Sequence, residues 1–403
     1  MPAHKWQFAP RFRRHAFGWR SDTPMLRIRQ AIAEIKAIAK KEPVLAAEGV
    51  VIFLEKLSPA LAQVDSSSGA IGSAVNHAID TLVPLVAKAE VEQKVRQRWL
   101  ERLWKAVEDD GMPYIEVLSD YWGALCAGPA MASKWADGFL PLAEQAWSPS
   151  APGHSYVKGG TACLASLLAA GRHRELLALL EKARPRWWHY RRWGVKALVA
   201  MGNSAEAIRY AEESPALNDP RWQIAETCEA IMLSLGQSDA AYSRYAVEAN
   251  QAGTHLATFR AIAKKYPHKT AADILRDLVA STPGAEGKWF AAAKEAGLFE
   301  EAIALVNHSP ADPRTLTRAA KDFAEKQPAF AMASGLAALR WIARGHGYEI
   351  TGAEVLEAYS ALMQAARSSG MDEQQVKAQV REMIAADQPG SRFMRTIIGP
   401  MVG

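Results

Sequence analysis

The side chains with the clearest chemical potential are basic and aromatic residues that alternate between positions 187 and 196. His189, Arg192 and Lys196 are spaced by three and four residues, so a helix would place all three on one face. An imidazole and two cations in a water-filled groove would attract an acidic ligand. The other interpretation is structural, because aromatic residues at helical spacing are more often core anchors and exposed arginines are common. Three tryptophans share the segment: Trp187, Trp188 and Trp193.

The first 24 residues form a second basic and aromatic segment. Residues 1–30 contain seven lysines and arginines and one aspartate. Cations neutralise phosphates while rings stack on unpaired bases, so a nucleic acid or another anion is one interpretation. The favoured interpretation is a strap over the helical body, because so many rings are costly to leave in water; a disordered end is the third. The five aromatic residues are Trp6, Phe8, Phe12, Phe17 and Trp19.

The sequence contains no pattern typical of a catalytic or metal site. Its ten histidines show neither HxxxH nor HExxH spacing, and its three cysteines form no CxxC pair. The glycine-rich signatures of nucleotide-binding loops do not occur either. Asn76, His77 and Asp80 share a helical face, which would matter only if the three were buried together. We therefore expect a protein that is not an enzyme and takes no cofactor or metal.

A glycine followed by acidic and apolar residues recurs through the middle of the chain and indicates which elements carry these side chains. The marker glycines are Gly171, Gly202, Gly236 and Gly297, at intervals of 31, 34 and 61 residues. The last interval is close to two steps, so the missing marker would fall near Tyr266. A period of about 30–34 residues is typical of stacked helix–turn–helix units. Glycine suits each turn because it adopts a positive φ without strain.

The whole chain is predicted to be helical. Apolar spacing of three and four indicates N-terminal helices over 25–41, 43–57, 70–88, 90–108 and 112–127, and C-terminal ones over 350–367 and 372–386. The fold class is therefore all-α, a right-handed helix–turn–helix solenoid. Ser, Pro and Gly mark a join at 148–153, and Pro and Asp mark joins between repeat units, as at Pro215 and 219–220. The predicted parts are an arm over 1–24, a helical unit over 25–147, a repeat array over 155–345 and capping helices over 346–403.

The 155–345 segment resembles a tetratricopeptide-type array, through its turn glycines, its small residues and the Glu-Ala-Ile of 206–208 and 301–303. The resemblance implies that an extended ligand binds thirteen, ten and six residues before each turn glycine, which gives His189, Arg192 and Lys196 before Gly202. The segments 188–195 and 258–267 also resemble a bacterial protein family, which implies no activity. Counting back in the same way from the other turn markers gives Lys158, Thr161, Gln223, Glu226 and Arg260 as ligand positions, with Lys264 nearby.

Charge and composition narrow the expected partners. The net charge of +5 is concentrated, because residues 1–30 hold +6 and the basic island over 172–196 another +6. No window approaches the roughly 18 apolar residues of a membrane span, and the N-terminus has no signal-type stretch. We expect a bacterial cytoplasmic interaction or scaffold module, with no membrane contact, that binds an acidic or extended protein or peptide. The alternative is a nucleic-acid-binding repeat protein that uses the arm and the basic island.

Overall fold

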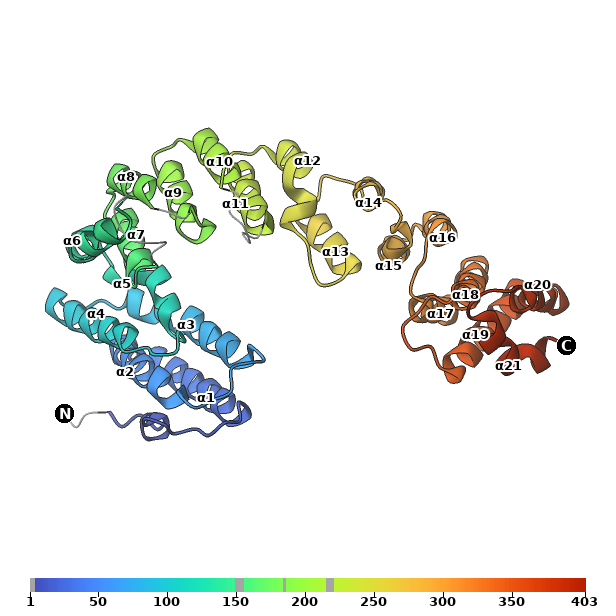
Figure 1. Cartoon of the computed structure of the whole chain (residues 1–403), viewed down its shortest axis with the longest axis horizontal. Coiled ribbons are helices and arrows are strands. Elements are labelled where there is room, and N and C mark those ends of the chain that lie inside the picture. Colours follow the sequence, from blue (N-terminus) through green and yellow to red (C-terminus); the bar gives the residue numbers. More distant parts are fainter. Residues whose placement is uncertain (1–3, 149–155, 184–185, 215–220) are drawn as a thin grey trace. The chain divides into compact units, whose positions relative to one another are not determined.

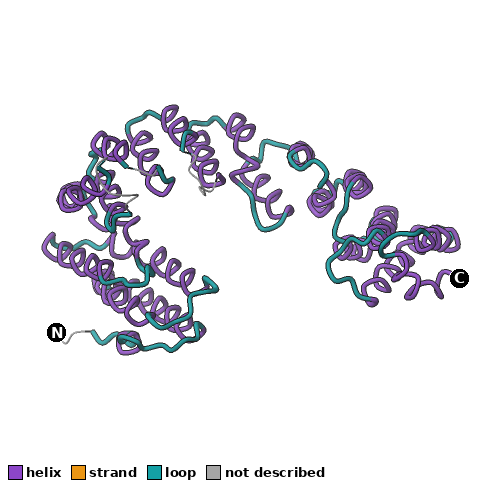
Figure 2. Tube along the Cα trace, viewed as in Figure 1, coloured by secondary structure: helices purple, strands orange, loops and turns teal. Residues whose placement is uncertain are grey.

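The chain is helical throughout the part that the structure describes. The computed structural model describes residues 4–148, 156–183, 186–214 and 221–403. These residues form 21 α-helices, three 3-10 helices and no strand (Figure 2), so the predicted all-α class is confirmed. The chain divides into two compact units, unit 1 over Met1–Asp219 and unit 2 over Pro220–Gly403. The division falls inside the predicted repeat array.

Unit 1 is built around one apolar core. Its buried side chains run from Trp6 in the N-terminal arm to Ala197, so the arm, the N-terminal helices and the first repeat pairs share this core. The elements, labelled in Figure 1, are η1 (Ala9–Phe12), α1 (Asp22–Ala39), α2 (Pro43–Leu61), α3 (Ala70–Lys88), α4 (Gln93–Glu108), η2 (Glu116–Tyr121), α5 (Trp122–Cys126), α6 (Pro129–Ala146), α7 (Gly160–Ala169), α8 (His173–Lys182), α9 (Trp188–Ala200) and α10 (Ser204–Glu212).

Unit 2 continues with helix pairs and ends in longer helices. The predicted C-terminal helices are present, and Thr351 and Glu354 form a capping box at the start of the first of them. The elements are α11 (Arg221–Ser234), α12 (Ser238–Ala249), α13 (His255–Lys265), α14 (Ala271–Ala280), η3 (Glu286–Trp289), α15 (Phe290–Glu295), α16 (Phe299–His308), α17 (Pro313–Asp322), α18 (Pro328–Ala343), α19 (Gly352–Ser369), α20 (Glu373–Ala385) and α21 (Ser391–Val402).

The four marker glycines make the same turn. Gly171, Gly202, Gly236 and Gly297 lie between paired helices with φ of +73°, +82°, +71° and +75°. After each glycine, the next backbone N–H donates to the carbonyl five residues earlier, at 2.9–3.0 Å. This pattern is the Schellman motif, which satisfies the last carbonyls of a helix and favours glycine at the left-handed position. The predicted helix–glycine–helix pairs are confirmed.

The fifth pair, α13 and α14, turns without glycine at Tyr266, as predicted. Tyr266 has φ of −120°, and its carbonyl accepts a hydrogen bond from the Lys269 N–H at 3.0 Å. Thr270 then caps α14 by accepting the Asp273 N–H at 3.1 Å. A side-chain cap on the second helix thus replaces the glycine turn on the first.

The N-terminal arm is a strap that runs along α2. Trp6, Phe8, Phe12 and Phe17 are at most 6% exposed. The rings of Phe8 and Phe12 lie edge-on to Phe53 of α2, with centroids 5.6 and 5.2 Å from it. Two backbone hydrogen bonds hold the second half: His15 N–H to the Pro59 carbonyl at 3.0 Å, and Asp65 N–H to the Trp19 carbonyl at 2.8 Å. Burial of the aromatic side chains matches the strap interpretation, and the fifth ring, Trp19, is exposed.

One predicted helix is wrong, and some joins lie outside the described residues. The 112–127 segment is not one helix: it contains η2 and the short α5. The buried Asp110 carboxylate accepts hydrogen bonds from the Ser58 hydroxyl and from the Ile115 N–H, at 2.8 Å for the latter, so the chain is held in a turn before η2. Residues 149–153 of the predicted 148–153 join, and the joins at Pro215 and 219–220, are outside the described part.

The expectation that no segment approaches a membrane span is wrong for α3, the one helix in the described residues that is long and apolar enough to cross a membrane. In the structure it packs against α1, α2 and α5 of unit 1. Its fully buried side chains, Ile71, Val75, Ile79 and Leu82 among them, belong to the core. Their apolar character is therefore used in packing within this unit.

Candidate functional site

His189 on α9 faces α7. Its Nε2 lies 2.8 Å from the Thr161 hydroxyl oxygen, so the two residues that the repeat count placed on neighbouring helices do meet. Burial, and then the charge of Arg192, lower the pKa of His189 below its ordinary value, against a smaller opposing effect of Asp120. The imidazole is therefore neutral at pH 7. In the described residues no carboxylate bonds its other ring nitrogen, so the pair lacks the third member of a catalytic triad.

Arg192 lies on the same face of α9 and is already paired. Its Nη2 donates to a carboxylate oxygen of Asp120 in η2 at 2.6 Å, and its Nε donates to the His189 carbonyl at 3.0 Å. The Arg192 and Asp120 side chains are 29% and 24% exposed, so the pair is half-buried. An acidic ligand at this position would have to compete with Asp120.

Lys196, one turn further along α9, lies over an aromatic ring. Its Nζ is 4.2 Å from the centroid of Trp193, a cation–π contact. Partial burial of the ammonium and the nearby Arg192 charge lower the pKa of Lys196. The Trp193 ring is buried, and its indole N–H has no partner in the described structure. The predicted face of α9 is thus real, and each of its polar groups has a contact within unit 1.

Lys158 lies before α7 and holds the end of α4. Its Nζ donates to the carbonyls of Val107, Glu108 and Asp110, at 3.0, 3.2 and 3.3 Å. A cation at the negative end of a helix stabilises the carbonyls that have no partner inside the helix. The nearby Glu116 has its pKa raised by burial, while Lys158 acts in the opposite direction. Lys158 is therefore a structural contact as well as a predicted ligand position.

The two predicted site residues of unit 2 have separate surroundings. The Arg260 guanidinium makes a double hydrogen bond to the Glu295 carboxylate, and the arginine is exposed. Lys264 is exposed and has no ion pair in the described residues. Lys158, His189, Arg192 and Lys196 belong to unit 1, so the predicted common stripe with Arg260 stays a prediction.

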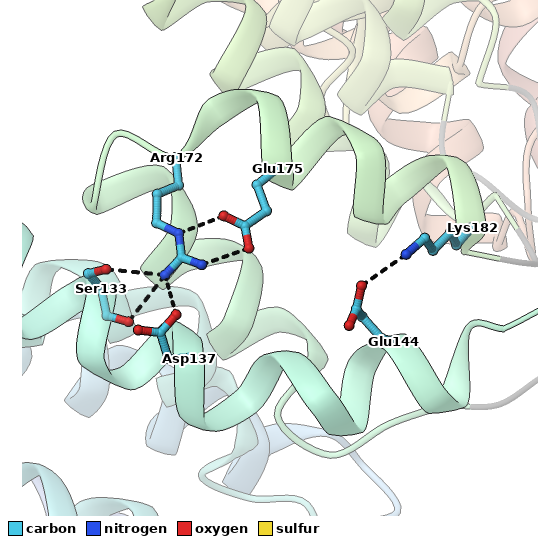
Figure 3. Close-up of polar contacts among 6 residues, drawn as sticks. All are labelled: Ser133, Asp137, Glu144, Arg172, Glu175 and Lys182. Atoms are coloured by element: carbon cyan, nitrogen blue, oxygen red, sulfur yellow. Dashed lines mark hydrogen bonds and ion pairs between the residues drawn. The ribbon is translucent and has the colours of Figure 1, made fainter.

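Four cations of the basic island over 172–196 form ion pairs within unit 1: Arg172, Lys182, Arg186 and Arg192. Arg172 makes a double hydrogen bond to Glu175 and reaches Ser133 and Asp137 on α6, while Lys182 donates to Glu144 at 2.9 Å (Figure 3). Arg191 is buried, and its guanidinium lies 3.8 Å from the centroid of the Tyr210 ring. Arg184 lies outside the described residues. The island is thus mainly a set of contacts between helices.

A groove in unit 2 combines charge with an open volume. It lies between α17 and α19 and has a volume of about 310 Å³. Arg314 bonds Glu354, Lys321 bonds Glu357, and Arg318 between them has no hydrogen bond or ion pair within the described residues. The apolar part of the lining consists of Pro313, Ile342 and Ile350. The arrangement can accept one carboxylate at Arg318 while two formed ion pairs flank it.

The described residues form no metal-binding cluster, and two of the three cysteine thiols are held protonated by burial. No group of three or more His, Cys, Asp or Glu side chains there is arranged to hold a metal ion. Burial raises the pKa of both Cys126 and Cys163 to about 12, so neither thiol is ionised at pH 7. Asn76, His77 and Asp80 are exposed on α3, and the Asp80 carboxylate accepts a hydrogen bond from the Tyr121 hydroxyl. The three residues are therefore not buried together, as a site on that face would require.

Sequence reasoning missed Asp120 and the α17–α19 groove. Asp120 lies 72 residues from Arg192, so no local spacing links them. The groove did leave a signal in the sequence. Arg314, Arg318 and Lys321 are spaced by four and three residues, which places them on one helical face, and two glutamates three residues apart, Glu354 and Glu357, follow later in the chain. Comparison with known proteins adds no family: no protein-family model matches the chain, and no curated protein matches it either.

Proposed function

We propose that this chain is a helical-repeat interaction module that binds an extended, acidic segment of a partner protein. The observation that carries the proposal is the recurrence of one helix pair in both units, with the same Schellman turn at Gly171, Gly202, Gly236 and Gly297. Within the units, first helices of successive pairs contact each other, α7 with α9 and α13 with α15. That packing fits a right-handed solenoid of the tetratricopeptide type, in which ligands lie along the row of first helices.

The proposed contact in unit 2 is the α17–α19 groove. Its unpaired Arg318 lies between two formed ion pairs, so a carboxylate of the partner gains a cation without breaking an existing bond. The neighbouring glutamates repel a second acidic group placed directly against them, which selects the spacing of the partner's charges. At the α9 face, by contrast, Asp120 already occupies Arg192.

The test is binding of partner proteins by the full-length chain and two charge reversals. Arg318→Glu should abolish or strongly weaken capture of an acidic partner. Arg276→Glu is the matched control, since Arg276 lies in the same unit, is exposed, and among the described residues pairs only with its helix neighbour Asp273. The capture is performed with and without nuclease. Loss of the partner on nuclease treatment, or equal losses in both variants, would reject this function.

A further inference from the structure

The outer surface of the arm and α1 carries an uncompensated positive charge. Residues 1–41 contain ten lysines and arginines against Asp22 and Glu34, a net of +8. Glu34 is occupied, because its two oxygens accept the backbone N–H groups of Gln7 and Phe8 at 2.7 and 3.1 Å. None of the ion pairs between described residues includes any of the ten cations: Lys5, Arg11, Arg13, Arg14, Arg20, Arg27, Arg29, Lys36, Lys40 and Lys41.

Two of these arginines are held side by side without a carboxylate. Arg11 of η1 and Arg27 of α1 both donate an Nη1 hydrogen bond to the Gln30 Oε1, at 3.0 and 2.8 Å. The two Nη1 atoms are therefore at most 5.8 Å apart, and the acceptor that they share is a neutral amide oxygen. Like charges this close repel each other, and an anion that accepts from both guanidinium groups would relieve the repulsion.

The backbone that carries these cations is fixed before any ligand arrives. The buried rings of Trp6, Phe8, Phe12 and Phe17 hold the arm along α2, so its arginines project from an ordered segment. Trp19 is the exception: its carbonyl is bonded to Asp65, but its side chain is 71% exposed. A large ring kept in water beside Arg20 is a surface on which a planar group can stack.

We propose that this surface binds single-stranded nucleic acid, with a phosphate between Arg11 and Arg27 and an unpaired base stacked on Trp19. The exposed Lys5, Arg13, Arg14 and Arg20 of the arm extend the track. Together with the site between Arg11 and Arg27, these cations offer about five phosphate contacts. The proposal concerns unit 1 and does not depend on the groove of unit 2.

A lipid surface fits this face less well. An interfacial helix inserts a row of apolar side chains into the headgroup region. On the exposed face of α1 the one large apolar side chain is Leu26, and four of the five aromatic rings of the arm are buried in the core. A nucleic acid requires only cations and a ring, which are the groups that this face exposes.

Fluorescence anisotropy with a labelled single strand of about 12 nucleotides tests the proposal on the full-length protein. With about five phosphate contacts, the affinity should fall about 100-fold between about 50 and 200 mM salt. The double variant Arg11→Gln/Arg27→Gln should reduce the salt slope by about one to two. Trp19→Ala should weaken binding about 5- to 150-fold, the range for loss of one stacked base.

Matched controls keep the result specific. Arg174→Gln/Arg209→Gln removes the same charge from exposed positions of unit 1, and Trp222→Ala removes an exposed tryptophan from unit 2; both should bind like the unaltered protein. Each variant must keep the circular dichroism and urea midpoint of the unaltered protein. Absence of binding at low salt, equal losses in the controls, or binding to phosphatidylserine vesicles but not to the oligonucleotide would overturn the proposal.

Discussion

Replacing Phe12 by alanine tests whether the arm is a structural strap. The Phe12 ring is 1% exposed and contacts the edges of Phe17 and Phe53 at centroid distances of 5.5 and 5.2 Å. The Phe53 contact joins the arm to the middle of α2, and the Phe17 contact joins two parts of the arm. Removal of the ring leaves a cavity between the arm and α2 and deletes both aromatic pairs.

The expected loss is large. Truncating a buried phenylalanine to alanine costs about 3–5 kcal/mol of unfolding free energy, because lost transfer energy and the cavity add. For a unit of this size each kcal/mol lowers the melting temperature by about 2–4 °C, so Phe12→Ala should lower the transition of unit 1 by about 6–20 °C. Differential scanning calorimetry measures this shift. Trypsin should also cleave the loosened arm faster at its arginines.

Trp19→Ala is the internal control, because it removes a larger ring from the same arm. That side chain is mostly in water, and such surface substitutions usually change stability by less than about 0.5 kcal/mol. Its melting transition should therefore coincide with that of the unaltered protein. Equal transitions in both variants, with unchanged proteolysis, would refute the packing of the arm along α2.

Three further outcomes follow from particular contacts. Gly202→Ala should cost about 1 kcal/mol, measured by urea unfolding, because φ is +82° there, whereas Gly202→Asn should cost less; a neutral alanine would contradict the turn. Tyr266→Phe should cost about 1.5–3 kcal/mol, because its hydroxyl donates at 2.6 Å to the buried Glu229 carboxylate, and the more exposed Tyr242→Phe should cost less. The pKa of His189 is lower in the folded protein than in the unfolded chain, so as the pH falls the unfolded chain binds the imidazole proton before the folded protein does. Stability should therefore fall as the pH drops below about 6.5. His189→Gln should remove that part of the pH dependence of the urea midpoint, and an unchanged profile would count against it.

The turns could be predicted because their cause is local. A left-handed residue at the end of a helix restricts the residue type at one position, and the hydrogen bonds that define the motif span only six residues. The marker glycines therefore reveal the pairs without any knowledge of packing. At Tyr266 the local cause differs, since Thr270 caps the next helix, and period alone located the turn.

The candidate site could be predicted only in part. Helical spacing placed His189, Arg192 and Lys196 on one face, but the spacing contains no information on what faces them. The partner of Arg192 is 72 residues away, and Lys158 finds its carbonyls 48–51 residues away. Such pairs depend on how helices pack, which residue periodicity does not specify.

The two basic segments, 1–30 and 172–196, carry the same net charge of +6, but their cations have different contacts because the segments pack differently. In the 172–196 island, α8 lies beside α6, so Asp137 and Glu144 meet Arg172 and Lys182 (Figure 3). The arm instead attaches to α2 through aromatic rings, so its cations project outward from an apolar contact. One neutral side chain, Gln30, accepts hydrogen bonds from Arg11 of the arm and from Arg27 of α1. A segment that packs through charge pairs part of its cations with neighbouring helices, whereas a segment that packs through rings leaves its cations without ion pairs in the described residues.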